Sequence, residues 1–202
     1  MKPIRLVIVA LFALSATAFA QILPPDAGET RTETHIRLFS PFSLEGLNPT
    51  LTIVGQVSGT CEFQSGVTQR PDAWNCRSVD GQTYDPCFQN PFDPADSVLA
   101  CTPDPQGGVT RLQLTNALPT ASAPRPLAER LPWLLELSNG LRCYRNPALT
   151  WQIGGLLALY ACGDNAYLFD APDRSNAIWR IFYLRFGQGT YLEPMGVQIA
   201  WY

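Results

Sequence analysis

Few residues of this sequence could carry acid–base or nucleophilic chemistry near neutral pH. Its one histidine is His35 and its one lysine is Lys2. Hydrolytic triads, thiol nucleophiles and zinc hydrolases normally rely on an imidazole, because histidine changes its charge in the physiological range. No G-x-S-x-G or H-E-x-x-H motif accompanies His35, so we interpret it as an exposed strand residue and not as a general base.

Carboxylates are the remaining candidates for catalysis. A glycoside hydrolase needs only two Asp or Glu groups about 5–9 Å apart. Three pairs could be nominated: Asp80 with Asp85, Asp93 with Asp96, and Asp164 with Asp170. All lie in turn-rich segments, where Asp commonly bonds to nearby backbone groups, and none has the spacing of an ordered calcium loop. We therefore interpret them as turn residues and keep a carboxylate-dependent envelope glycoside hydrolase as the alternative function.

The cysteines favour structural cross-links over metal binding or redox chemistry. They are Cys61, Cys76, Cys87, Cys101, Cys143 and Cys162. No C-x-x-C pair occurs, so neither a zinc site nor a reactive dithiol is indicated, and the sequence predicts no metal and no cofactor. Six cysteines allow fifteen pairings. We prefer pairing between sequence neighbours (61 with 76, 87 with 101, 143 with 162), because each pair closes a short segment that contains turn residues.

Tryptophan is the residue type that could bind a ligand by stacking. Trp179 and Trp201 lie in predicted strands, and we expect them in the core. Trp74 and Trp151 lie in less regular stretches. We nominate these two as exposed aromatics that could stack on sugar rings or anchor a protein partner.

The first twenty residues have the order of a secretory signal peptide. Lys2 and Arg5 precede an apolar run over residues 6–14, and Ala18-Phe19-Ala20 forms an A-x-A cleavage site. The apolar stretch is shorter than the roughly 20 residues that a spanning helix needs. We expect cleavage near Ala20 and a soluble product in the periplasm or the extracellular space, with no membrane span.

Removal of the signal changes the charge balance. It leaves twelve basic residues, all arginine, against seventeen acidic ones, a net charge of −5. Arginines scattered over a mildly acidic chain do not form the basic stripe that nucleic acid requires. We therefore exclude nucleic acid as a partner and expect a cell-envelope glycan or protein, whose identity the sequence does not specify.

Alternating apolar residues and turn residues predict an all-β fold, with antiparallel hairpins in a sandwich-like scaffold. After the signal peptide (1–20) we expect a flexible lead over 21–34 and a β-rich segment with four cysteines over 35–118. A proline-rich connection over 119–132 and a β-rich segment with two cysteines over 133–202 follow. The last three segments could form a single domain.

Individual strands can be placed within this outline. In the first half they are expected over 35–39, 50–58 and 109–114, whereas the prolines between Cys61 and Cys101 predict an irregular, disulfide-stapled stretch. In the second half Asn139-Gly140 predicts a tight hairpin. Further strands are expected over 156–162, 166–169, 178–186 and 197–201. The stretch 178–186 is apolar on both faces, which predicts a strand covered on both sides.

Several of these residues form a pattern that resembles an uncharacterised family of exported bacterial proteins. The pattern comprises Gly59-Thr60-Cys61, Arg70-x-Asp72-Ala73-Trp74-x-Cys76, Asp85-Pro86-Cys87-Phe88, Cys101 and Trp133-x-x-x-Leu137-x-Asn139-Gly140-x-x-Cys143. It spans most of the chain after the signal. The resemblance implies an exported, disulfide-bonded protein and no particular activity. We therefore expect a non-catalytic binding or interaction module, ahead of the hydrolase alternative.

Overall fold

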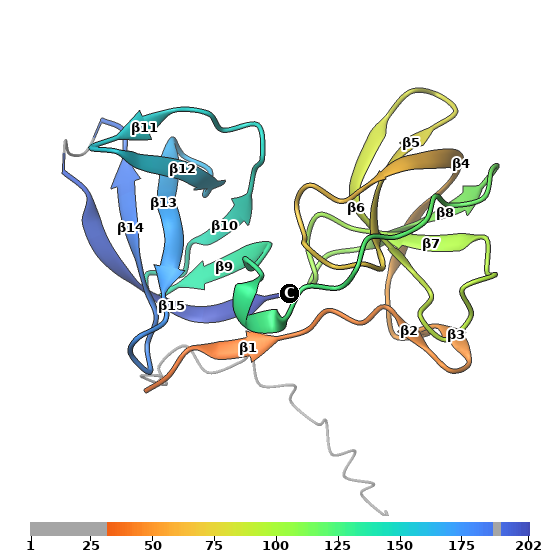
Figure 1. Cartoon of the computed structure of the whole chain (residues 1–202), viewed down its shortest axis with the longest axis horizontal. Helices are drawn as coiled ribbons and strands as arrows, with labels where there is room; N and C mark the ends of the chain where they lie inside the picture. The colour runs from red at the N-terminus through yellow and green to blue at the C-terminus, as the bar shows by residue number, and fades with distance from the viewer. Residues whose placement is uncertain (1–31, 188–190) are drawn as a thin grey trace, which may run out of the picture. The chain divides into compact units, whose positions relative to one another are not determined.

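The computed structural model describes residues 32–187 and 191–202, which contain fifteen strands and one short 3-10 turn (Figure 1). The predicted all-β fold is therefore confirmed. The signal peptide expected over 1–20, and most of the lead expected over 21–34, lie outside the described residues. Within the described ranges there is no helix with the length and hydropathy needed to cross a lipid bilayer.

Five consecutive strands form a closed barrel: β4 (Ile53–Gln64), β5 (Ala73–Ser78), β6 (Thr83–Gln89), β7 (Val98–Cys101) and β8 (Val109–Leu114). Neighbours along the chain pair antiparallel. Because five is an odd number, the first and last strands run in the same direction, and β8 closes the barrel through a parallel pairing with β4. Leu99 and Leu112 fill the interior together with the first four cysteines. The structure thus has a closed barrel here, where we expected antiparallel hairpins in a sandwich-like scaffold.

The stretch between Cys61 and Cys101, predicted to be irregular, contains β5, β6 and β7 instead. Its prolines occupy positions where no ladder donor is needed. Pro71 precedes β5, and Pro91 and Pro94 lie in the loop between β6 and β7. Pro86 lies within β6 and follows a cis peptide bond, at a shift in the pairing with β5. A shift of this kind leaves residues outside the ladder, so proline is tolerated there.

Six further strands make a second closed path: β9 (Leu134–Leu137), β10 (Arg142–Arg145), β12 (Leu156–Ala161), β13 (Ala166–Asp173), β14 (Arg180–Arg185) and β15 (Glu193–Trp201). Each pairs antiparallel with the next. β15 also pairs with β9, so the hydrogen-bonded path returns to its start. The short strand β11 (Gln152–Ile153) pairs with β12, and β2 (Phe42–Ser43) forms a small hairpin with β3 (Gly46–Leu47).

Strand β1 (His35–Arg37) joins the second sheet and not the barrel that follows it in sequence. It pairs parallel with β15, where Ile199–Trp201 are also paired with β9. The predicted segment 35–118 is therefore divided between two sheets. His35 is exposed on β1, as expected from its sequence context.

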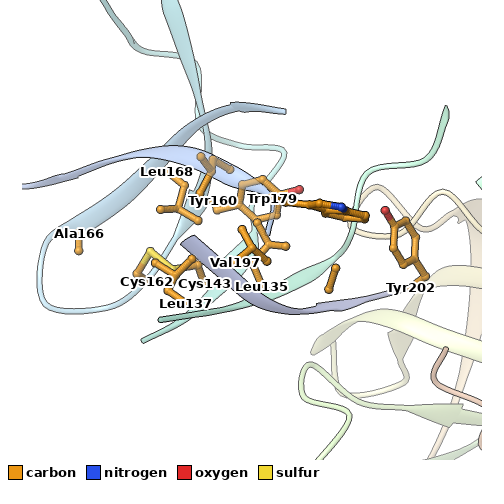
Figure 2. Close-up of a cluster of buried hydrophobic side chains, with 12 residues drawn as sticks. Leu135, Leu137, Cys143, Tyr160, Cys162, Ala166, Leu168, Trp179, Val197 and Tyr202 are labelled. Atoms are coloured by element: carbon orange, nitrogen blue, oxygen red, sulfur yellow. A yellow bond between two sulfur atoms is a disulfide. The ribbon is translucent and has the colours of Figure 1, made fainter. Parts of the chain in front are cut away.

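The core of the second sheet is drawn in Figure 2, where Leu168, Tyr160 and Val197 converge near the Cys143–Cys162 disulfide. The Tyr160 hydroxyl donates a hydrogen bond to the Pro132 carbonyl over 2.9 Å. Trp179 and Trp201 are buried, which confirms their expected place in the core.

Strand β14 has buried side chains on both faces. Ile181 lies in the main core of the second sheet, whereas Leu184, on the opposite face of the strand, is buried in a separate cluster with Phe169. The prediction of a strand covered on both sides is therefore confirmed at these positions, although Phe182 remains 43% exposed.

Aromatic residues connect the barrel to the second sheet. Phe39, Phe88 and Trp133 pack against one another, with ring centroids 5.2 to 6.1 Å apart. The same cluster includes Ala100 of β7 and Ile199 of β15. Residues 31–202 accordingly form one unit.

Candidate functional site

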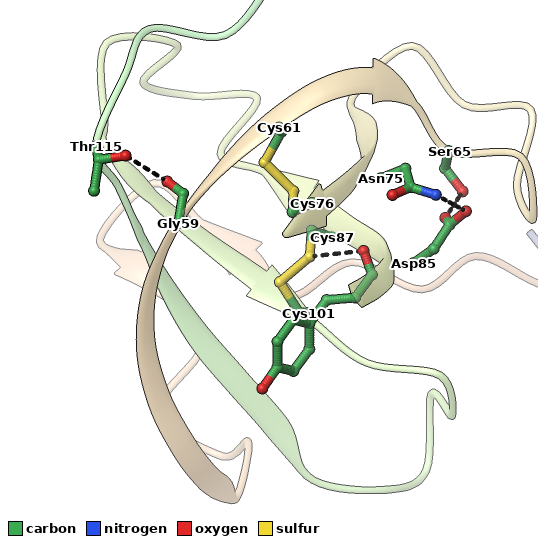
Figure 3. Close-up of a disulfide and its surroundings, with 10 residues drawn as sticks. Gly59, Cys61, Ser65, Asn75, Cys76, Asp85, Cys87, Cys101 and Thr115 are labelled. Carbon is green, nitrogen blue, oxygen red and sulfur yellow. Dashed lines mark hydrogen bonds between the residues drawn. A yellow bond between two sulfur atoms is a disulfide. The ribbon is translucent and has the colours of Figure 1, made fainter. Parts of the chain in front are cut away.

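Three disulfides hold the strands together: Cys61–Cys76, Cys87–Cys101 and Cys143–Cys162. Each joins cysteines that are neighbours in sequence. The first two link residues directly opposite each other on paired strands of the barrel (Figure 3). The third joins β10 to the residue that follows β12. These cross-links fix the strands from which the loops project.

Neither tryptophan nominated as an exposed binding residue is freely exposed. Trp74 is only 1% exposed, because β5 directs it into the barrel interior with Leu99 and Leu112, so this prediction was wrong. Trp151 is half-buried. Its indole packs against Tyr167, Phe169 and Phe186, with centroid distances of 4.9 to 5.4 Å.

Half of the nominated carboxylates serve their own turns. Four of the six engage a nearby turn or strand partner: Asp80 accepts a hydrogen bond from Ser78, Asp93 from the Ala95 amide, Asp96 from the Val98 amide, and Asp170 from the Leu157 amide. Asp164 forms an exposed ion pair with Arg185. Asp85 is different, because it supports a polar pocket.

This pocket has a volume of about 270 Å³ and is lined by side chains from three separate segments. The turn over residues 64–71 contributes Gln64, Thr68 and Gln69; the proline-rich connection contributes Ser122 and Arg125; and β10 contributes Arg145. Hydroxyl, amide and guanidinium groups dominate its wall. We refer to it below as the arginine pocket.

Asp85 holds the turn that forms one wall of the arginine pocket. Its carboxylate accepts hydrogen bonds from the Ser65 hydroxyl and from Asn75 at 3.1 Å (Figure 3). It also accepts the Gly66 amide at 3.2 Å. The Ser65 hydroxyl oxygen in turn accepts the amides of Val67 and Thr68. Burial raises the pKa of Asp85, and these hydrogen bonds oppose the rise without cancelling it. The wall is therefore rigid, because its backbone donors are satisfied internally.

Arg145 crosses from β10 to the same turn. Its Nη1 donates to the carbonyl oxygens of Gly66 and Val67, at 2.8 and 3.1 Å. Its Nε is buried and has no hydrogen-bond partner in the described part of the chain. Burial lowers the pKa of Arg145, and the like charge of Arg125 lowers it further, while Tyr160 and Asp85 act in the opposite sense. Two cationic side chains therefore lie close to each other.

The proline-rich connection is held against the turn by side-chain amides. Gln64 accepts hydrogen bonds from the amide and the hydroxyl of Ser122, and Gln69 accepts the Leu131 amide at 2.9 Å. Arg125 projects from this connection and is exposed. Among the described residues its guanidinium has no hydrogen-bond or ion-pair partner.

Arg70 also lines the arginine pocket, but its N–H groups already donate hydrogen bonds within the protein. It forms an ion pair with Asp72 and donates to the carbonyl oxygens of Phe39 and Tyr202. Its guanidinium stacks over the Phe88 ring at 4.8 Å. We assign Arg70 a structural role, in which it ties the barrel to the residues that follow β1 and β15.

The lining of the arginine pocket contains three arginines and no acidic residue. Three other cavities described on the surface each include an aspartate: Asp80, Asp96, or Asp170 with Asp173. The arginine pocket is thus the one of these four whose charge suits an anion. No group of three or more His, Cys, Asp or Glu side chains within the described ranges could hold a metal ion.

Sequence reasoning did not identify Arg125 and Arg145 as site residues. They occur singly, in a proline-rich stretch and in a strand, and no motif joins them. Only the folded path of the connection brings them together. Comparison with family models, curated proteins and solved structures found no match to this chain, so the assignment of the site rests on its geometry alone.

Proposed function

We propose that this protein is a non-catalytic binding module that acts outside the cytoplasm, at the cell envelope or in the extracellular space. The observation that carries the proposal is the pairing of all six cysteines into disulfides, with none left free. Disulfides persist in oxidising compartments and are rare in the cytosol. The export signal expected over residues 1–20 agrees with this location.

The distribution of polar groups supports binding over catalysis. Five of the six nominated carboxylates are engaged in a hydrogen bond or ion pair within the fold, and Asp85 holds a turn of the arginine pocket. The pocket itself offers hydrogen-bond donors on a cross-linked scaffold. Preorganised donors of this kind bind a ligand without a large loss of conformational entropy.

Two measurements test the proposal. Expression of the full chain in a bacterial host, followed by N-terminal sequencing of the exported product, should give Gln21 as the first residue. The oxidised product, immobilised and exposed to purified cell-wall glycans and to secreted proteins, should retain one class, and prior reduction should abolish the retention. A cytoplasmic product with six free thiols, or an exported product that retains nothing, would refute the proposed function.

A further inference from the structure

The arginine pocket contains two cationic groups that the fold does not neutralise directly. The Arg125 guanidinium has no hydrogen-bond or ion-pair partner among the described residues, and Arg145 donates to backbone carbonyls only through Nη1. The carboxylate that acts electrostatically on Arg145 is Asp85, whose oxygens accept hydrogen bonds from Ser65, Gly66 and Asn75. Positive charge therefore remains available at this surface.

The orientation of Arg145 determines what it can still bind. With Nη1 held by the Gly66 and Val67 carbonyls and Nε enclosed by the protein, Nη2 is the donor group that remains for a ligand. A guanidinium N–H forms strong charge-assisted hydrogen bonds with a carboxylate or phosphate oxygen. An oxyanion at this end of the pocket would accept a hydrogen bond from Nη2.

The remaining wall suits a polar ligand. The Gln69 side chain uses its oxygen to accept the Leu131 amide, which leaves its NH₂ group without a partner among the described residues. Thr68 and Ser122 add hydroxyl groups. A volume of about 270 Å³ is near the lower end of the range for small-molecule pockets, and is sufficient for one charged sugar or a group of similar size.

We propose that the arginine pocket binds the anionic oxygen group of a small polar ligand, with Arg145 donating through Nη2 and Arg125 as the second cation. The group is a carboxylate, as on an acidic sugar, or a phosphate, as on a sugar phosphate. This inference rests on the proposed function, because it specifies the chemical class that the binding module recognises.

Calorimetric titration of the exported, oxidised protein at low ionic strength tests the assignment. The probes are glucuronate, glucose 6-phosphate and neutral glucose. We expect one or both anions to bind and glucose to show no binding. A preference for glucuronate identifies a carboxylate source, and a preference for glucose 6-phosphate identifies a phosphate source. Binding should weaken in high salt, because partly exposed charges are screened.

Two variants and a matched control localise the effect. Arg125→Gln should weaken anion binding by about tenfold, as expected for the loss of one charged hydrogen bond. Arg145→Lys keeps the charge but removes the Nη2 donor, and should weaken binding to a similar extent. Arg111→Gln removes an exposed arginine on β8 and should leave affinity unchanged.

The outcomes separate this inference from the proposed function. Equal binding of glucose, absence of binding by both anions, or equal affinities of Arg125→Gln and Arg111→Gln would each refute the anion site. If Arg125→Gln still retains the same envelope component as the wild type, the proposed binding function is supported but does not depend on this pocket. If the anions bind but no envelope component is retained, the anion site is supported and the proposed role at the envelope is refuted.

Discussion

Arg142 on β10 forms a bidentate ion pair with Asp104, thirty-eight residues earlier, in the loop after β7. The two hydrogen bonds measure 2.5 and 2.6 Å, and the Tyr144 hydroxyl donates a third to the same carboxylate. Glu136 lies 3.9 Å from the Arg142 Nε and accepts the Trp201 indole N–H at 2.8 Å. This network fastens the β7–β8 loop to the second sheet.

The network predicts a loss of stability in acid. Burial alone would raise the pKa of Asp104, but the hydrogen bonds and charge of Arg142, with help from the Gln106 amide and Tyr144, lower it overall. A carboxyl whose pKa is lower in the folded state stabilises the protein above the unfolded pKa of about 3.9, and this contribution disappears as pH falls through the folded value.

Asp104→Asn should therefore lower the free energy of unfolding at neutral pH by on the order of 1 kcal/mol, since the pair is partly exposed and screened. The difference from the wild type should shrink below about pH 4, where the Asp104 carboxyl gains its proton during unfolding. Urea unfolding, followed by tryptophan fluorescence at several pH values from 7 to below about 4, measures this difference in the free energy of unfolding. Asp164→Asn, which breaks the exposed pair with Arg185, is the control and should change little. A constant difference at every pH would contradict the role of Asp104.

Removal of the Cys143–Cys162 cross-link should destabilise the second sheet. The two cysteines are nineteen residues apart, and a loop of this size restricts the unfolded chain. The double variant Cys143→Ala/Cys162→Ala should lower the free energy of unfolding by about 3 kcal/mol. Guanidinium unfolding measures the change. The corresponding double variant of Cys61 and Cys76, with a separation of fifteen, provides a comparison of similar expected size. A loss well below about 1 kcal/mol in both would show that the strands hold without these bonds.

Thr34 joins the stretch before β1 to the second sheet through its hydroxyl. The hydroxyl donates to the Val197 carbonyl at 2.6 Å and accepts the Trp179 amide at 2.8 Å, and the side chain is buried. Thr34→Val keeps the shape but leaves both backbone groups unpaired, so we expect a loss of about 2 kcal/mol.

Thr34→Ser retains the hydroxyl and is the matched control, for which the loss should be clearly smaller. Thermal unfolding followed by circular dichroism compares the two. Equal melting temperatures for Thr34→Val and Thr34→Ser would show that the hydroxyl does not matter.

Gly59 lies where two barrel strands approach too closely for a side chain. A Cβ at this position would stand 2.9 Å from the Ser78 Cα and closer still to the Arg77 carbonyl oxygen. Backbone atoms cannot yield easily, so Gly59→Ala should destabilise by about 2–3 kcal/mol.

Gly55, on the same strand, is the control for this effect. A Cβ there would meet the Thr110 side chain at an ordinary 3.4 Å, so Gly55→Ala should have a minor effect. Urea unfolding of both variants measures the difference. Similar stabilities would contradict the steric account of Gly59.

Local signals in the sequence predicted many of the strands. The strand over 109–114 has the predicted bounds, and Asn139-Gly140 forms the expected hairpin turn, with Gly140 at a φ of +81°. Both predictions depend only on residues close together in sequence. The cysteines also lie within short range of their partners, which made neighbour pairing a sensible choice.

Features that depend on distant pairings could not be predicted. The prolines before Cys101 predicted irregular structure, and that prediction failed. The bulge that accommodates Pro86 forms only when β5 and β6 pair, so the sequence alone does not reveal it. The closure of each ring of strands depends on contacts between residues far apart in sequence. The arginine pocket requires the connection over 119–132 to fold back on the turn over 64–71, and no local pattern encodes that path.

The place of β15 in the topology bears on how the chain folds. β15 is the last strand described, yet it completes the pairing of β9, of β14 and of β1. The second sheet therefore cannot close on itself until the residues around Ile199 have joined it. A chain whose closure depends on such long-range contacts folds more slowly than one built from local hairpins.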